Sequence, residues 1–202
     1  MKDIFMKYII LLVALSANMA LGLETKAKVS FDDYKSLVAA VESHRESRLI
    51  DLNTFLEMSK DPDVIILDSR SAFRYGRLHL KGARHLAFAD YTQENLARVI
   101  PSSDTKILIY CNNNFEGNQT DLATKVFVPA SPAEGGLGRE FAVQKKPLMM
   151  ALNIPTYINL YGYGYRNVYE LNELVNVNDP RISFEGSTVP STSQPDLRQT
   201  LR

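Results

Sequence analysis

The chain has 202 residues, of which 45% are hydrophobic and 23% charged, and its 23 basic and 23 acidic side chains balance. This globular composition excludes a wholly disordered, collagen-like or coiled-coil chain, and the zero net charge argues against a nucleic-acid binder, which needs a basic surplus. The single cysteine excludes an internal disulfide and zinc sites built on cysteine pairs; since the three histidines are dispersed, we expect no metal and no cofactor.

The first 22 residues have the features of a secretory signal peptide. Two lysines flank the start of an apolar run from Tyr8 to Leu15, and the small residues Ala20 and Gly22 suit a cleavage site after Gly22. The run is shorter than the roughly 20 residues that a membrane-spanning helix needs. We expect an exported protein, periplasmic or secreted, without membrane attachment after cleavage; an uncleaved anchor or a buried helix is the alternative.

The next segments predict two helices and a buried strand. Residues 23–46 form a polar N-terminal extension whose scattered apolar residues have helical spacing. A second helix is predicted over Leu49–Lys60, with Asp51 as its cap. The uninterrupted apolar run Val64–Leu67 then predicts a strand that is covered on both faces, as in a parallel sheet.

The middle of the chain places the cysteine directly after a strand. A helix is predicted over Tyr91–Ile100, and a second buried strand over Lys106–Tyr110, which Cys111 follows. Residues 112–147 are rich in Asn, Gly and Pro and predict a long loop, interrupted by a short helix around Thr120–Lys125.

The last part of the domain predicts one more helix and strand. Pro155 suits the first position of a helix that runs to about Tyr161, and Asn167–Leu171 predicts a third strand. From Gly186 onward the chain is polar, and we expect a disordered tail. The alternation of helices and strands predicts an α/β domain with a central, mostly parallel sheet flanked by helices. Cys111 would lie at the C-terminal edge of that sheet, where sites of this class form.

Four segments, in this order, resemble the signature segments of the rhodanese-like (sulfurtransferase) domain family. They are Val64–Arg70, which ends in Asp-x-Arg; His79–Leu86, similar to His-Ile-Pro-Gly-Ala; the strand and cysteine of Ile107–Cys111; and Gly164–Leu171, similar to Gly-Tyr-x-Asn-Val. The resemblance implies a three-layer rhodanese-like domain over residues 47–178, with an insertion at 118–147 and a polar tail at 179–202. Leu78 and Lys81 depart from the family pattern, and the loop after the cysteine lacks the arginine or lysine that many members have.

The resemblance implies that Cys111 is the nucleophile and that the residues after it form the substrate-binding loop. These loop residues are Asn112, Asn113, Asn114, Phe115, Glu116 and Gly117. Backbone N–H groups of such a loop can stabilise a thiolate and a persulfide. Asp68 and Arg70 are supporting residues that either bind substrate or make structural contacts beneath the loop.

These residues predict an exported sulfurtransferase or persulfide carrier that moves a sulfane sulfur through a Cys111 persulfide. The partners would be a small donor, thiosulfate or a persulfide, and a thiol acceptor, with residues 118–147 available to bind a protein. The alternative is an inactive rhodanese-fold binding module that recognises a protein or ligand through the enlarged loop. A phosphatase on this fold is excluded because Gly117 stands where it would need an arginine, and a dithiol oxidoreductase is excluded because no second cysteine exists.

Overall fold

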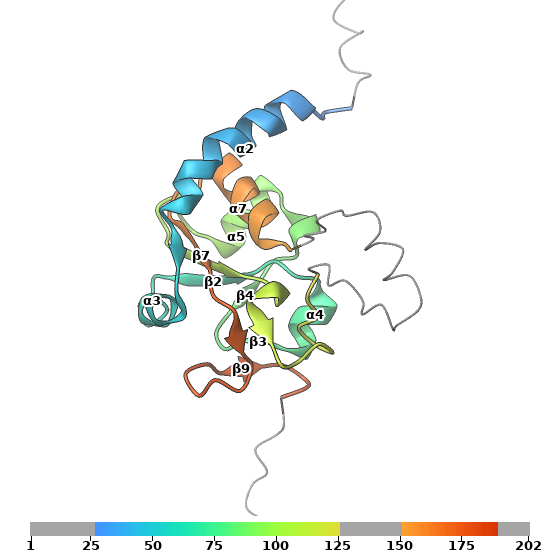
Figure 1. Cartoon of the computed structure of the whole chain (residues 1–202). Coiled ribbons are helices and arrows are strands. Elements are labelled where there is room, and N and C mark those ends of the chain that lie inside the picture. The colour runs from blue at the N-terminus through green and yellow to red at the C-terminus, as the bar shows by residue number, and fades with distance from the viewer. Residues whose placement is uncertain (1–26, 126–150, 190–202) are drawn as a thin grey trace, which may run out of the picture. The chain divides into compact units, whose positions relative to one another are not determined.

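The computed structural model describes residues 27–125 and 151–189 of the chain (Figure 1). The predicted signal peptide at residues 1–22 lies outside these ranges, as do residues 126–147 of the predicted insertion and the end of the predicted tail. The chain divides after Ser36 into a short N-terminal unit and a main unit, which holds the sheet and the cavities. Across the described ranges, every helix is too short or too polar to span a bilayer.

The main unit is built on a five-stranded sheet with the strand order β1-β7-β5-β2-β4. Its strands are β1 (Leu49–Ile50), β2 (Ile65–Asp68), β4 (Arg84–His85), β5 (Ile107–Tyr110) and β7 (Val168–Leu171). Every neighbouring pair is parallel. The predicted α/β class with a central parallel sheet flanked by helices is therefore confirmed.

Short helices connect the strands and flank the sheet. The α-helices are α2 (Phe31–Glu46), α3 (Leu52–Met58), α4 (Ala72–Arg77), α5 (Gln93–Val99) and α7 (Asn153–Gly162), and the 3₁₀ turns are η1 (Phe88–Asp90) and η2 (Asn112–Asn114). Figure 1 shows α5 and α7 on one side of the sheet and α3 on the other. This arrangement covers both faces of the sheet, as the predicted three-layer domain requires.

Alternate residues of the central strand β5 belong to two separate cores. Ile107 and Ile109 pack with residues of α5 and α7, whereas Leu108 and Tyr110 pack with residues of α3 on the opposite face. All four side chains are at most 3% exposed. Because both faces of the strand are buried, its sequence shows no alternation of polar and apolar residues.

The predicted helix over Leu49–Lys60 begins later than expected. Its first two residues form β1 instead, paired with β7 at the edge of the sheet, and α3 starts at Leu52. A two-residue edge strand is too short to leave a periodic signal, which is why the pattern missed it. The predicted cap is confirmed, because the Asp51 carboxylate accepts the backbone N–H of Thr54 at 2.8 Å.

Two helix predictions after the cysteine need correction. The short helix around Thr120–Lys125 is wrong: the chain makes turns there, and the Asn118 side chain accepts the N–H of Asp121 at 3.0 Å. Asparagine side chains compete with helical backbone bonds in this way. The helix that contains Pro155 begins two residues earlier, at Asn153, since proline is tolerated throughout the first turn.

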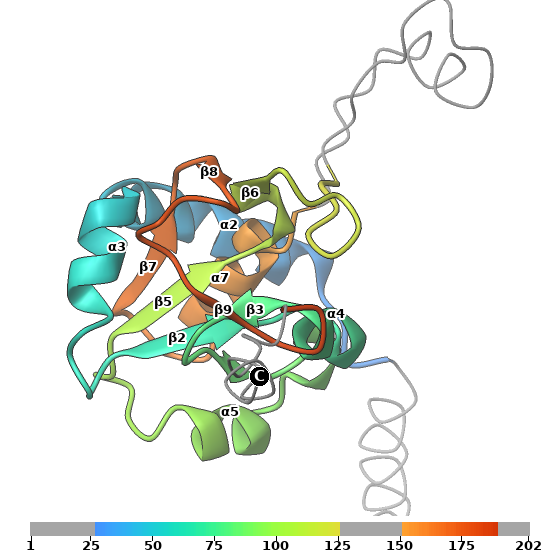
Figure 2. The same ribbon diagram turned by 90° about the horizontal axis from the view of Figure 1, so that it is seen from below.

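Two small sheets border the main one, as Figure 2 shows from below. β3 (His79–Leu80) pairs antiparallel with β9 (Phe184–Glu185), and β6 (Phe115–Glu116) pairs parallel with β8 (Val175–Asn176). The residues after β9 continue along α4, where Gly186 has a φ of +130° and a Cβ there would lie 2.3 Å from the carbonyl oxygen of Arg77. Residues 186–189, which lie within the predicted tail, therefore pack on the domain.

Candidate functional site

Cys111 lies at the C-terminal end of the central strand and lines a cavity of about 480 Å³. The cysteine directly follows β5 in extended backbone conformation and precedes the 3₁₀ turn η2. Its side chain is only 1% exposed to bulk solvent. The sulfur is thus at the sheet edge where the sequence predicted it, buried at the wall of a cavity.

Five segments of the chain contribute residues to this cavity, which is called the Cys111 cavity below. Its lining residues are Ser69, Arg70, Ser71, Arg74, Ala87, Phe88, Ala89, Cys111, Asn112, Ala123, Thr124, Lys125 and Leu152. Three of these described residues are basic and none is acidic. The charge of the lining therefore favours an anionic occupant.

The Cys111 sulfur accepts a hydrogen bond from the backbone N–H of Leu152, with 3.3 Å between nitrogen and Sγ. Leu152 is the cap residue of the ten-residue helix α7, whose first N–H groups carry partial positive charge. An N–H group and a helix N-terminus both stabilise a sulfur anion. The two residues are 41 positions apart in the chain.

Asp68 and Arg70 form a buried network beneath the turn that follows Cys111. The Asp68 carboxylate accepts from Arg70 Nη2 at 2.6 Å and from the Tyr110 hydroxyl at 2.6 Å. Arg70 Nη1 donates to Asn112 Oδ1 at 2.8 Å, and Nη2 also donates to the carbonyl of Leu78 at 2.6 Å. These bonds engage the guanidinium in structural contacts that hold the first loop residue in place.

Charge and burial set the protonation of this network. Burial lowers the pKa of Arg70, but hydrogen bonding and the charge of Asp68 outweigh it, so the pKa is raised and the guanidinium stays charged. Burial, followed by the charge of Asp68, raises the pKa of Tyr110 well above its ordinary value. The Tyr110 hydroxyl therefore remains a donor to the carboxylate at every physiological pH.

The first two asparagines after the cysteine tie η2 to a neighbouring segment. Asn112 Nδ2 donates to the carbonyl of Ala123 at 3.1 Å, and Asn113 Oδ1 accepts the N–H of Lys125 at 2.8 Å. Asn112 lines the Cys111 cavity, whereas Asn113 lines a different one. The Asn112 amide nitrogen and the Asn113 amide oxygen thus serve the loop's own conformation.

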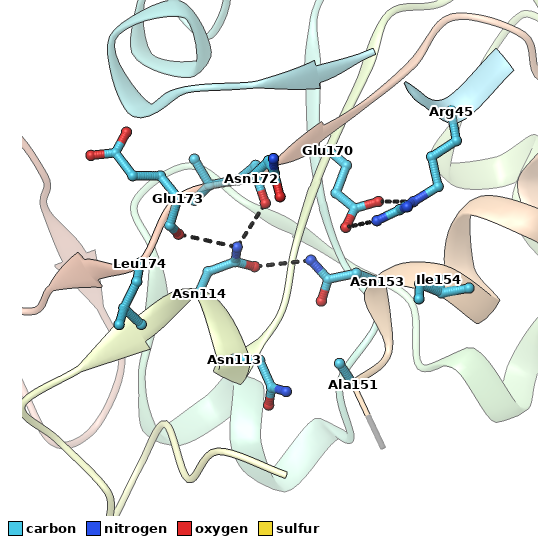
Figure 3. A pocket seen from close by; sticks show the side chains of 11 residues that line it. Arg45, Asn113, Asn114, Ala151, Asn153, Ile154, Glu170, Asn172, Glu173 and Leu174 are labelled. Atoms are coloured by element: carbon cyan, nitrogen blue, oxygen red, sulfur yellow. Dashed lines mark hydrogen bonds and ion pairs between the residues drawn. The ribbon is translucent and has the colours of Figure 1, made fainter. Parts of the chain in front are cut away.

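The third asparagine holds the backbone of the cysteine itself. Figure 3 shows Asn114 and its bond to Asn153. Asn114 Oδ1 accepts the Cys111 N–H at 2.9 Å and also the Nδ2 of Asn153 at 3.0 Å. Its own Nδ2 donates to the carbonyl of Leu171 at the end of β7, at 2.7 Å. Asn114 therefore connects the cysteine, the start of α7 and the edge of the sheet.

The remaining predicted loop residues leave the Cys111 cavity. Phe115 is 1% exposed and packs its ring against Tyr110 in the core, and with Glu116 it forms strand β6. The Glu116 side chain is exposed, and Gly117 follows with a φ of +92°. None of Phe115, Glu116 and Gly117 is among the described residues that line the cavity.

Of the residues that line the Cys111 cavity, sequence reasoning singled out only Arg70, Cys111 and Asn112 as site residues. Among those it missed, Arg74, Lys125 and Leu152 supply charge or an N–H group to the cavity. Arg74 lies on α4, and its Nη1 donates to the carbonyl of Thr120 at 2.6 Å. Arg74 is four residues after Arg70, and this spacing could have indicated that the two side chains lie close together. Lys125 and Leu152 had no such signal, because only the folding of distant segments brings them to the cysteine.

Comparison with known proteins gave one family match. The model of the rhodanese-like domain matches residues 51–144, a range that contains Cys111. A search of the curated proteins found no match.

Two solved structures are similar over part of the chain, each at 18% identity. The Alr3790 protein from Anabaena sp. matches over 60% of this chain and 68% of its own, with a TM-score of 0.34. The BH2092 protein from Bacillus halodurans matches over 42% and 63%, with a TM-score of 0.30.

Proposed function

The chain contains a rhodanese-like domain, and from this premise we propose that it is a sulfurtransferase that carries a sulfane sulfur on Cys111. The observation that carries the proposal is the contact between the Cys111 sulfur and the N–H of Leu152 at the start of α7. A nucleophilic thiolate needs such stabilisation. A cysteine buried as a small apolar side chain needs neither that N–H nor a cavity with basic residues.

The reaction has two displacement steps. The Cys111 thiolate attacks the outer sulfur of thiosulfate; a bond forms between the two sulfurs, the sulfur–sulfur bond of the donor breaks, and sulfite leaves with its electron pair. The cysteine then holds a persulfide anion. An acceptor thiolate or cyanide attacks the terminal sulfur of that persulfide, and Cys111 leaves as the thiolate. One cysteine suffices for the cycle, and no external oxidant or reductant enters it.

The basic lining of the Cys111 cavity supports an anionic sulfur donor. Arg74 and Lys125 reach the cavity from α4 and from the segment after β6. They supply the positive charge that the loop sequence lacks, and the acidic side chain of that loop, Glu116, lies outside the lining. Basic groups at a cavity raise the local concentration of a dianion and help to bind it.

Export belongs to the same proposal. The basic start, apolar run and small-residue cleavage site of residues 1–22 support cleavage after Gly22. Mass spectrometry of the protein recovered from its native host should find residue 23 at the N-terminus. A native N-terminus at Met1 would contradict export by this route.

The sulfurtransferase proposal is tested by direct detection of the intermediate. The full chain is incubated with thiosulfate, and the Cys111 peptide should gain about 32 Da, the mass of one sulfur. Addition of cyanide should then release thiocyanate and restore the original mass. Cys111→Ser should neither gain this mass nor release thiocyanate. Alkylation of the unaltered protein beforehand should block the mass gain and the release of thiocyanate.

The opposite result has a definite meaning. If no sulfane donor leaves a persulfide on Cys111, and if thiocyanate forms equally fast with Cys111→Ser, the sulfurtransferase proposal is wrong. The domain would then act as the binding module.

A further inference from the structure

A second cavity, of about 280 Å³, lies beside the turn that follows Cys111 and is shown in Figure 3. It is called the asparagine pocket below. Its lining residues are Arg45, Asn113, Asn114, Ala151, Asn153, Ile154, Glu170, Leu171, Asn172, Glu173 and Leu174. In the described ranges it shares no lining residue with the Cys111 cavity. It is therefore a separate site.

The hydrogen bonds around Asn114 determine how the Asn153 amide is oriented. Asn114 Oδ1 must be an acceptor, because it receives the backbone N–H of Cys111 at 2.9 Å. Asn153 must therefore turn its Nδ2 toward Asn114, at 3.0 Å, and its Oδ1 away. That oxygen is buried, on a residue that is 7% exposed, and it has no hydrogen-bond partner among residues 27–125 and 151–189.

A donor in the same pocket is also unpartnered. Asn113 Oδ1 accepts the N–H of Lys125 at 2.8 Å, which fixes the orientation of this amide and leaves its Nδ2 free. The nitrogen is buried and has no partner in the described parts of the chain. Figure 3 shows the free ends of Asn113 and Asn153 on the same side of Asn114, with Ala151 beside them. A buried donor and a buried acceptor left unpaired are costly unless something occupies the pocket.

The charges of the pocket disfavour an anion. Arg45 and Glu170 neutralise each other through two hydrogen bonds, at 2.6 and 2.7 Å. The remaining charged side chain of the described lining is Glu173, whose Oε2 accepts the N–H of Leu52 at 2.7 Å. The lining therefore has a net negative charge, in contrast to the basic Cys111 cavity.

The rim of the pocket is apolar. Ile154 is 38% exposed and Leu174 is 62% exposed, and both belong to the large apolar side chains that the fold leaves open to solvent. Ala151 lies with them along the lining. A ligand with an apolar group would cover these side chains and gain the free energy of removing them from water.

We propose that the asparagine pocket binds a small neutral ligand through a carboxamide group. The ligand's N–H donates to Asn153 Oδ1, its carbonyl accepts from Asn113 Nδ2, and an apolar substituent packs on Ile154 and Leu174. A primary carboxamide presents a donor and an acceptor side by side and so can satisfy both orphaned atoms with one group. The pocket contains no atom of Cys111, so the proposal stands independently of sulfur transfer.

The test is an NMR titration of the full, isotope-labelled chain with N-acetyl-leucinamide, a neutral amide with an apolar side chain. The side-chain NH₂ signals of Asn113 and Asn153 and the backbone signal of Leu174 should shift together and saturate. N-acetyl-leucine, which replaces the terminal amide by a carboxylate, should bind about fivefold or more weakly, because it loses one donor and adds a charge.

Surface variants show whether the probe is bound in this pocket. Leu174→Ala should weaken binding of N-acetyl-leucinamide by about threefold or more, because the rim loses apolar contact area. Val38→Ala is the matched control: this side chain is 39% exposed on α2 and is not among the lining residues. Cys111→Ser should bind the amide as tightly as the unaltered chain, even if sulfur transfer is abolished.

Two results would overturn the proposal. One is the absence of saturable shifts at these residues; the other is equal binding of the amide and the carboxylate with no effect of Leu174→Ala. Either would mean that the two orphaned atoms bind only water.

Discussion

At the scale of single residues, the proposed reactivity of Cys111 draws on the backbone N–H group of Leu152. The N–H of Leu152 reaches Sγ at 3.3 Å, and it begins a helix whose N-terminus carries partial positive charge. Neighbouring polar side chains are engaged elsewhere: Arg70 binds Asp68, and Asn114 binds the cysteine's own N–H. The N–H of Leu152 is therefore the contact to the sulfur that α7 supplies.

Replacement of Leu152 by proline isolates this contribution. Leu152 has a φ of −82°, close to the value that proline imposes, so Leu152→Pro removes the N–H while the backbone is preserved. We expect alkylation of Cys111 at neutral pH to slow by about three- to tenfold, the effect of one hydrogen bond to a charged acceptor. Leu152→Ala, which keeps the N–H, should react nearly as fast as the unaltered chain. Equal rates for the proline and alanine variants would contradict the role of the N–H.

At the scale of elements, short helices with side-chain caps connect the strands. Thr92 caps α5, because its hydroxyl oxygen accepts the N–H of Asn95 at 3.1 Å. Leu96 on the same seven-residue helix is fully buried in the core that covers β5. So short a helix gains little from its own backbone bonds, and its stability comes from this cap and from packing.

The cap of α5 can be tested by substitution. Thr92→Ala should lower the free energy of unfolding by about 1 kcal/mol, because one N–H of the first turn loses its acceptor. Thr92→Ser keeps an equivalent oxygen and should recover most of that loss. Urea unfolding followed by circular dichroism measures both variants, and an equal loss in the two would argue against capping.

At the scale of the whole molecule, a histidine between packed elements makes stability depend on pH. His44, near the end of α2, bonds through Nδ1 to the Tyr157 hydroxyl of α7 at 2.9 Å. Burial, and then the charges of Arg48 and Arg166, lower the pKa of His44 below its ordinary 6.5. Burial raises the pKa of Tyr157 to about 12, so its hydroxyl stays protonated.

The lowered pKa of His44 makes the folded protein less stable at acid pH. Below the unfolded-state pKa of 6.5, the unfolded chain binds a proton at this histidine that the folded chain excludes. The His44 contribution is therefore fully present above that pH and decreases as the pH falls toward the folded-state pKa. We expect urea midpoints to decrease from about pH 7.5 to about pH 5.5, and the decrease to be smaller for His44→Gln. An unchanged slope in that variant would exclude His44 as the cause.

Much of the site could be predicted because its signals are local. An apolar run followed by a cysteine marks a buried strand end. Asp68 ends the neighbouring strand β2, and Arg70 follows it two residues later. Parallel strands carry their C-terminal ends to the same edge, so these residues had to come close together. The family resemblance was also carried by such short segments, and the match over residues 51–144 confirms it.

The parts of the site and of the fold that the sequence did not predict depend on contacts between distant segments. Leu152, Arg74 and Lys125 reach the Cys111 cavity only after the folded sheet brings their segments together. The edge strand β1 and the small sheet β6–β8 are equally short and equally dependent on a partner. Two residues form a strand only where another strand offers free hydrogen-bonding groups.

The sequence alone thus determined the α/β class, the buried strands and the position of Cys111 at a strand end, because burial on both faces and chain reversal leave their mark on neighbouring residues. Only the tertiary structure decided which N–H faces the sulfur, and which asparagine atoms of the second pocket have no partner within the described part of the chain. Those outcomes are set by hydrogen bonds across long chain separations, 41 residues in the case of Cys111 and Leu152, and no local pattern encodes them.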